Sequence, residues 1–283
     1  MLQTTTRTAP TTDDHVALAA ACDHGVGLCT IVGIEGSFSR RMGAQLAVLP
    51  DGSTVGSLAD GCLEAQLASD MREMKAPTVI RYGRGSDVID FRLPCGSGLD
   101  ILLDPAPDRT ACRRAIGSLE GRTTANLRLP NVSPLQNRNY IPALRIAAFG
   151  EGPELQKLNA LAHALGISID CQEKDRLSLG QRAEHCQLDR WTAALLLFHD
   201  HEWELPLLEQ ALDSQAFYIG AQGGENARVA RTLALTQRGV AEEQIARIRS
   251  PIGLIPSCKT PASLALSAIS EIVARYERLH AAA

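Results

Sequence analysis

Residues 145–155 read RIAAFGEGPEL, and this stretch decides the fold of the second half of the chain. The apolar run 145–149 has the length of a strand, Gly150 and Gly152 permit a tight turn, and a helical pattern begins at Glu154. Strand, glycine turn and helix in this order are typical of a parallel sheet wound with helices. In such a turn the backbone can approach an anionic ligand, to which the helix offers its first N–H groups.

The rest of the second half continues the alternation of strands and helices. We expect strands at 167–171, 193–198 and 217–219, helices at 154–165, 205–212 and 226–238, and a closing helix from Thr260-Pro261 to about 279. Threonine suits a helix cap, and proline suits the first helical position. The sequence therefore predicts a Rossmann-like parallel-sheet domain over 144–283.

The first half has a different pattern, in which strand-length apolar runs alternate with turn signals. Pro50-Asp51-Gly52 is a hairpin signal. We expect strands at 28–34, 44–49, 54–58, 79–82, 88–93 and 99–103, and one convincing helix at 63–74. These elements predict a mostly antiparallel α+β domain over 13–127, so the fold class of the whole chain is α/β.

Two segments have no strand or helix pattern. Residues 1–12 are rich in threonine, and we expect a disordered tail there. Residues 128–143 are rich in proline and asparagine and have neither a helical nor a strand period, so we expect a linker between the two domains.

Composition limits the classes of partner. The chain has 283 residues, 45% of them apolar, which is enough for a core in each of two domains. Its net charge of -4 comes from 28 basic and 32 acidic residues without a basic block, which argues against nucleic acid. The longest apolar run, 193–198, is far shorter than the roughly 20 residues of a membrane span. Without a secretory signal or CxxC pairs among the eight cysteines, we expect a cytoplasmic protein with reduced thiols.

The glycine turn of the second half is a candidate cofactor site. Asp170 lies about 20 residues after Gly150, at the end of the expected second strand, where an acid can bond a ribose 2′-hydroxyl. With Gly152 these residues favour NAD over NADP. Leu155 replaces the third glycine of the dinucleotide motif, however, and two acidic residues in the turn would repel a diphosphate. The alternative is a tight turn with a solvated aspartate.

His199 and Asp200 directly follow the expected strand 193–198. This places both side chains at the carboxyl edge of the sheet, where ligands of wound sheets bind. The alternative is structural, because Asp200 could cap a helix that begins near Trp203.

In the first half, residues 36–43 read GSFSRRMG and follow an expected strand. Small residues such as Ser37 and Gly43, combined with Arg40, suit the binding of an anion by backbone and guanidinium. The alternative is a solvated loop.

Two cysteines lie in glycine-containing turns of the same domain. Cys62 follows Gly61 at the expected start of a helix, where the free N–H groups can stabilise a thiolate. Cys95 precedes Gly96 between two expected strands. Two such thiols indicate soft-ligand chemistry with sulfur or molybdenum, and the alternative is a buried, inert cysteine.

Six motifs in order resemble one known family. GSFSRRMGAQLAV at 36–48, GSLADGCLEA at 56–65 and CGSGLDILLDP at 95–105 resemble the amino-terminal signature of the xanthine dehydrogenase accessory family, XdhC/CoxI. FHDHEWELPLLEQAL from 198, YIGAQGG from 218 and SPIGLIPSCKTPASLALSAISEIVA from 250 resemble its carboxyl-terminal Rossmann-like domain.

The resemblance implies a maturation factor rather than an enzyme, with no catalytic residue. Such a factor binds molybdenum cofactor (molybdopterin), supports its sulfuration by a cysteine desulfurase, and delivers it to an apo molybdenum hydroxylase. By analogy with the family we expect a homodimer.

Individual site residues are also implied by the resemblance. Cys62 and Cys95 match the motif cysteines and become candidate contacts of the dithiolene or ligands of the metal. Arg40 becomes the contact of the cofactor phosphate, and Glu64 and Glu271 become supporting polar groups.

The chain departs from the family pattern at informative positions. Asp60 stands where the family usually has glycine, and Glu225 stands where it tends to have a basic residue. Two other functions therefore remain open. One is an NAD-dependent oxidoreductase of a small substrate, with His199 as the general acid. The other is a scaffold that recognises a partner enzyme without a cofactor.

Overall fold

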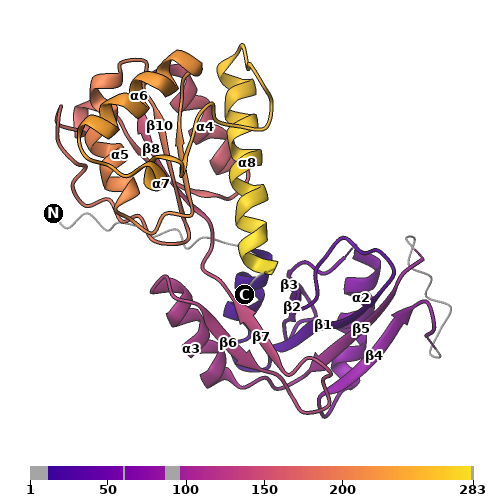
Figure 1. Cartoon of the computed structure of the whole chain (residues 1–283). Coiled ribbons are helices and arrows are strands. Elements are labelled where there is room, and N and C mark those ends of the chain that lie inside the picture. The colour runs from indigo at the N-terminus through magenta and orange to yellow at the C-terminus, as the bar shows by residue number, and fades with distance from the viewer. Residues whose placement is uncertain (1–11, 60, 87–95, 282–283) are drawn as a thin grey trace. The chain divides into compact units, whose positions relative to one another are not determined.

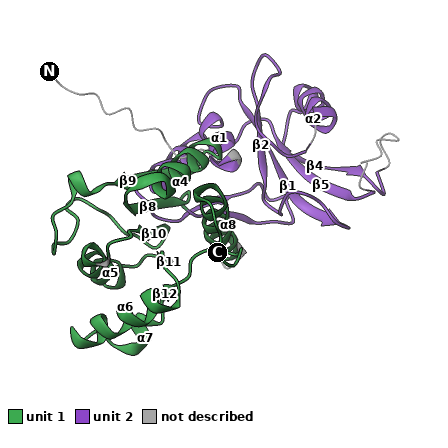
Figure 2. Cartoon of the chain, turned by 90° about the horizontal axis from the view of Figure 1, so that it is seen from above, with its two compact units in different colours: residues 1–10, 142–283 green, residues 11–141 purple. Residues whose placement is uncertain are grey.

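The computed structural model describes residues 12–59, 61–86 and 96–281 (Figure 1). The chain forms two compact units, Thr11–Ile141 and Pro142–Ala283, drawn in purple and green in Figure 2. We call them the amino unit and the carboxyl unit. Each is built on one five-stranded sheet.

The sheet of the amino unit is antiparallel throughout, as the sequence predicts. Its strand order is β3-β2-β1-β5-β4. The strands are β1 (Gly27–Glu35), β2 (Gln45–Val48), β3 (Thr54–Gly56), β4 (Thr78–Gly83) and β5 (Gly98–Asp104). The predicted hairpin around Pro50-Asp51-Gly52 is confirmed by the pairing of β2 with β3. The strand expected at 88–93 lies outside the described residues.

Helices cover both faces of this sheet. Side chains of β5 alternate between two cores, because Leu102 packs in one while Ile101 and Leu103 pack in the other. Helix α2 (Gly61–Glu73), predicted from the sequence, covers the second core. Helices α1 (Asp13–Ala20) and α3 (Arg109–Glu120), which the sequence reading did not identify, cover the first.

The caps of these two helices explain where they begin. The Asp108 carboxylate accepts hydrogen bonds from the backbone N–H groups of Thr110 and Ala111, at 2.9 and 3.0 Å, at the start of α3. Thr12 accepts a bond from His15 N at 3.3 Å at the start of α1. It is therefore a cap and not part of the predicted tail, whose other residues lie outside the described ranges.

The segment 128–143, expected as a linker, instead contributes a strand to the amino unit. Strand β7 (Asn137–Tyr140) pairs antiparallel with β6 (Ala125–Arg128) in a two-stranded hairpin. Arg138 and Tyr140 are both buried, so a charged residue interrupts what would otherwise be an apolar alternation. The two units divide after this hairpin, between Ile141 and Pro142.

The carboxyl unit has the predicted Rossmann-like parallel sheet. Its strand order is β12-β11-β10-β8-β9, with every neighbouring pair parallel. The strands are β8 (Arg145–Gly150), β9 (Ser168–Gln172), β10 (Thr192–Leu197), β11 (Tyr218–Ala221) and β12 (Ile248–Arg249). Strand β8 lies between β9 and β10, and the chain runs from it first to β9 on one side and then to β10 on the other. The carboxyl ends of β8 and β10 therefore flank a topological switch point, where wound sheets bind ligands.

Helices pack on both faces of the parallel sheet (Figure 1). Helices α4 (Gly152–Ala164) and α8 (Pro261–Ala281) pack together, whereas α5 (Glu204–Leu212) and α6 (Glu225–Gln237) pack on the core that includes Leu196 and Ile219. Short elements complete the unit: η1 (Lys174–Arg176), η2 (His201–Trp203) and α7 (Glu242–Ile245).

The predicted cap of the last helix is confirmed. Thr260 Oγ1 accepts a hydrogen bond from Ser263 N at 3.1 Å, directly before Pro261 opens α8. Across the described ranges, no helix combines the length and apolar character required to span a bilayer.

Candidate functional site

Three loops of the amino unit meet at one end of its sheet, and they carry the three motifs of the first half. Ser97, just before β5, donates a hydrogen bond from Oγ to the carbonyl oxygen of Ser37, just after β1. Arg40 Nη2 donates to Ser57 Oγ at 3.1 Å, just after β3. Residues separated by up to sixty positions are thus joined in one cluster of loops.

Cys62 lies in the first turn of α2 and is exposed. A Cβ added to its neighbour Gly61 would meet no heavy atom of the described chain within 4 Å, so the space beside the thiol is open. Glu64 does not face this space freely, because its Oε1 accepts bonds from the backbone N–H groups of Leu58 and Ala59, at 3.0 and 3.3 Å. Glu64 therefore braces the loop that leads to Cys62.

The second motif cysteine, Cys95, lies outside the described residues, so its distance from Cys62 stays a prediction. Its neighbour Gly96 is exposed and has a φ of +68°. A Cβ at Gly96 would also meet no described heavy atom within 4 Å. Both glycines of the thiol-bearing turns thus border open space.

The other thiols are less accessible than Cys62, which is the only exposed one of the seven described cysteines. Burial raises the pKa of Cys112 to about 12 and the pKa of Cys171 to about 11. Burial likewise raises the pKa of Cys29 far above its ordinary value. Among the described cysteines, Cys62 is therefore the thiol most accessible to a ligand.

Arg138 holds the candidate anion-binding loop from behind, a role that the sequence reading missed. Its Nε donates to the carbonyl oxygen of Gly43 at 2.6 Å, and its Nη2 forms a buried ion pair with Asp14 Oδ2 at 2.6 Å. Gly43 has a φ of +82°, and a Cβ there would come within 2.6 Å of the Arg138 side chain. The sequence signal for this role is a single arginine two residues before Tyr140, which is buried, within the expected linker segment.

In the carboxyl unit, the predicted glycine turn joins β8 to α4, and the strand order places it at the switch point. A Cβ at Gly150 would come within 2.5 Å of the carbonyl oxygen of Leu197 on β10, so only glycine permits this approach. Gly152 has a φ of +78° and opens α4. Glu151 between them forms an ion pair with Lys174 at 2.6 Å.

His199 and Asp200 follow β10 at the carboxyl edge, as expected from the sequence. His199 Nε2 lies 3.6 Å from Glu154 Oε2, although 65% of the imidazole side chain is exposed. Asp200 Oδ1 accepts a bond from Glu202 N at 3.2 Å in the short η2 turn, whereas the N-cap of α5 is Trp203, which makes no side-chain capping bond. Within the described ranges, no three His, Cys, Asp or Glu residues are grouped so that they could hold a metal ion.

Asp170 is not at the end of its strand. It pairs with Ala147 in the middle of β9, which continues to Gln172 opposite Phe149. Its exposed carboxylate accepts a bond from Gln172 Nε2 at 3.2 Å. The carboxylate is therefore two residues short of the position at which an acid would reach a ribose at the carboxyl edge.

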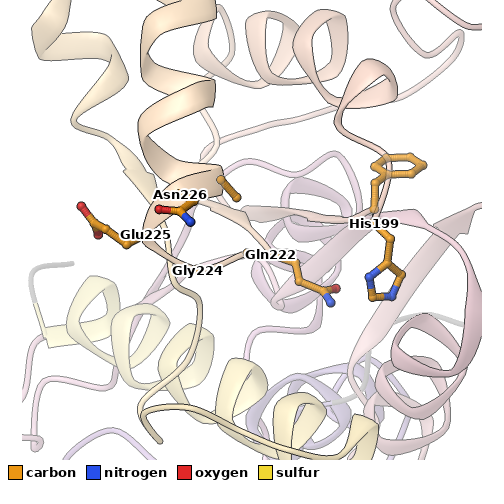
Figure 3. A pocket seen from close by; sticks show the side chains of 8 residues that line it. His199, Gln222, Gly224, Glu225 and Asn226 are labelled. Atoms are coloured by element: carbon orange, nitrogen blue, oxygen red, sulfur yellow. The ribbon is translucent and has the colours of Figure 1, made fainter.

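A cavity of about 530 Å³ opens at the ends of β10 and β11. It is lined by Phe198, His199, Gln222, Gly223, Gly224, Glu225, Asn226 and Ala227 (Figure 3). Arg231 of α6 supports its floor, because Nη2 donates to the carbonyl oxygen of Gln222 at 2.8 Å. The same guanidinium forms a buried ion pair with Glu204 at 2.9 Å.

Glu271, expected as a supporting group for a cofactor, has protein partners instead. It is buried on α8, where Oε2 accepts bonds from Tyr218 OH at 2.7 Å and Gly253 N at 2.8 Å. Its other oxygen lies 3.3 Å from Arg275 Nη2. These contacts attach the loop before α8 to the parallel sheet and leave the carboxylate with a structural role.

Comparisons with known proteins agree with the motifs. The family model described as the XdhC Rossmann domain matches residues 146–272, and the model of the XdhC and CoxI family matches residues 19–83. The molybdenum cofactor insertion chaperone PaoD of Escherichia coli (strain K12) is 32% identical over 294 residues, which cover 95% of this chain and 90% of that protein.

More distant relatives extend the agreement. A probable xanthine dehydrogenase subunit of Bacillus subtilis (strain 168) is 22% identical, covering 89% of this chain and 93% of that one. A crystal structure described as a xanthine dehydrogenase from Bacillus halodurans has the same fold, with a TM-score of 0.72 at 19% identity and coverage of 95% and 96%. With two family models matched in order and a relative of 32% identity along nearly its whole length, the chain belongs to the XdhC and CoxI family.

Proposed function

We propose that this protein binds molybdenum cofactor as cargo and inserts it into a xanthine dehydrogenase-type molybdenum hydroxylase. The observation that carries the proposal is the 32% identity to a molybdenum cofactor insertion chaperone along 95% of the chain. Because both units are covered, the likeness is not limited to a common Rossmann domain.

The loop cluster of the amino unit supports this function chemically. A thiolate is a soft ligand that suits molybdenum or the sulfur chemistry around it, and Cys62 is exposed at a helix N-terminus beside the open space at Gly61. Arg40 brings a guanidinium to the same cluster through its bond to Ser57. In our proposal Cys62 contacts the metal or dithiolene with Cys95, and Arg40 contacts the cofactor phosphate.

The finer steps follow from this placement. Cargo held at an exposed thiol is accessible to a cysteine desulfurase, which would supply the terminal sulfur before insertion. We also propose that the protein acts in the cytoplasm as a homodimer, by analogy with its family.

The test is anaerobic incubation of the full chain with molybdenum cofactor, followed by gel filtration and measurement of bound molybdenum and pterin. We expect stoichiometric binding by the wild type and a loss of at least tenfold for Cys62→Ser. Cys258→Ser is the matched control, because this partly buried thiol lies in a loop of the carboxyl unit. It should bind like the wild type. Absence of cargo on the wild-type protein would refute the proposal.

A cofactor-free scaffold makes the opposite prediction for the partner enzyme. In that case Cys62→Ser would mature a co-expressed molybdenum hydroxylase as well as the wild type does. Activity of that hydroxylase, normalised to its amount, therefore separates the two functions.

A further inference from the structure

The cavity at the carboxyl edge of the parallel sheet shares no residue with the thiol-bearing loops. It is bordered by Gln222 after β11 and by His199 after β10, and Glu154 of α4 lies 3.6 Å behind the imidazole. Figure 3 shows the side chains of Gln222 and His199 on the same side of the strand ends. The proposed function does not use these three residues.

Two oxygens in this region are buried without a hydrogen bond. Glu154 Oε2 and Gln222 Oε1 have no hydrogen-bond partner in the described chain. Buried polar atoms in folded proteins are nearly always paired, and exceptions concentrate at sites that bind something. Because both atoms are acceptors, the group that would satisfy them is an N–H or O–H donor.

The charge of the region disfavours the diphosphate of a dinucleotide. Glu151 and Glu154 stand in the turn where a diphosphate would approach the start of α4, and Asp200 lies nearby, 3.9 Å from Lys174. Lys174 is already paired with Glu151 at 2.6 Å. Carboxylates therefore surround the N–H groups in the first turn of α4, and they would repel a diphosphate there.

The start of α6 is less acidic than the sequence suggests. Glu225 points away from Gln222 in Figure 3 and forms an ion pair with Arg228 on the surface. Its neighbour Asn226 lines the cavity with an amide, and the helix N-cap Gly224 has no side chain to cap the first turn. The first N–H groups of α6 can therefore serve an acceptor atom of a neutral ligand.

We propose that this cavity binds an uncharged heterocycle with an amide or amidine edge, of the kind found in pterins and nucleobases, and that it excludes a dinucleotide diphosphate. A glutamine side chain presents one acceptor and one donor side by side, which matches such an edge with two parallel hydrogen bonds. A volume of about 530 Å³ lies in the range of small-molecule sites.

The test measures binding of four probes to the full chain by isothermal titration: 6-hydroxymethylpterin, cytidine, guanosine and NAD. We expect at least one of the three uncharged probes to bind, and NAD to bind at least tenfold more weakly than that probe. The probe with the highest affinity identifies the source of the heterocycle. Failure of all three uncharged probes, or NAD binding as tight as theirs, would overturn the proposal.

A first variant tests the unpaired oxygen of Gln222. Gln222→Met keeps the size of the side chain and removes the amide. It should lower the affinity for the bound probe at least tenfold. Gln237→Met is the matched control at the exposed end of α6 and should bind like the wild type. Equal affinity of the Gln222 variant and the control would overturn the assignment of the site.

Two further variants make the result specific. Glu154→Gln keeps the shape and removes a negative charge from the first turn of α4, so it should improve the binding of NAD while it leaves the affinity for the heterocycle unchanged. Cys62→Ser should bind the probe like the wild type, because the thiol belongs to the amino unit. Loss of probe binding at the cavity can thereby be distinguished from loss of cargo binding at Cys62.

Discussion

The two candidate sites are built on the same support but present different chemistry. In the amino unit a buried arginine, Arg138, donates to the carbonyl oxygen of Gly43 from behind the candidate anion-binding loop. In the carboxyl unit a buried arginine, Arg231, donates to the carbonyl oxygen of Gln222 behind the cavity. In both units the backbone of the loop is held by the core, so its conformation does not depend on the residues that face a ligand.

The exposed sides of the two loops differ. The amino unit presents the thiol of Cys62 beside open space, together with a guanidinium. The carboxyl unit presents carboxylates, of which Glu154 retains a buried oxygen without a hydrogen bond. One kind of buried support thus holds the loop of the proposed cargo site in one unit and the loop of the proposed heterocycle site in the other.

The largest expected effect tests whether the buried support is needed. Arg231→Met removes the guanidinium that pairs with the buried Glu204 carboxylate, and we expect a loss of about 3–5 kcal/mol in the free energy of unfolding of the carboxyl unit. Both tryptophans of the chain, Trp191 and Trp203, belong to this unit, so their fluorescence during urea unfolding reports on it alone. Arg228→Met, which breaks only an exposed pair, should leave the midpoint unchanged. Equal midpoints for the two variants would show that the buried ion pair contributes no more to stability than the exposed one.

A smaller effect contrasts the two glycine turns. Gly150→Ala forces a Cβ to within 2.5 Å of the carbonyl oxygen of Leu197, and we expect a loss of about 1–3 kcal/mol. Gly61→Ala should cost almost nothing, because no described heavy atom lies within 4 Å of the added Cβ. Circular dichroism during thermal unfolding measures both variants. A Gly61 variant as unstable as the Gly150 variant would contradict the open space beside Cys62.

The smallest effect concerns the network behind the amino-unit loop. Burial lowers the pKa of His15 below its ordinary value of 6.5, although the nearby Asp14 carboxylate opposes the shift. The unfolded chain therefore takes up this proton more readily than the folded chain, so stability is present above pH 6.5 and decreases as the pH falls below it. His15→Gln should reduce the difference between the urea midpoints at pH 7.5 and pH 5.5. Circular dichroism measures the unfolding at each pH. His24→Gln, at an exposed position, should preserve that difference.

Part of the candidate site could be predicted because its signals are local. Glycines in a strand-to-helix turn, as at Gly150, identify the switch point of a wound sheet from a few neighbouring residues. Cys62 could likewise be placed at a helix start, and His199 at the end of a buried strand. The structure places all three where the sequence predicts them.

Other residues could not be assigned because their partners are distant in the sequence. In the sequence, nothing indicates that the Glu271 carboxylate has partners. In the folded chain, Tyr218 and Gly253 both donate hydrogen bonds to one of its oxygens. Arg138 was hidden in a segment read as a linker, since its partners Asp14 and Gly43 lie more than ninety positions away. A charged residue on a buried strand face breaks the apolar alternation by which strands are recognised.

The two-part α/β architecture, the family resemblance and the local positions of Cys62 and of the glycine turn could all be inferred from the residues alone. Hydrophobic periodicity and turn chemistry act over a few residues, and they are written directly in the chain. Which polar groups are bonded to other parts of the protein, and which lack a partner, became visible only in the folded chain. That distinction depends on burial and on partners brought together by folding, so Glu271 became structural while Glu154 and Gln222 retained unpaired oxygens.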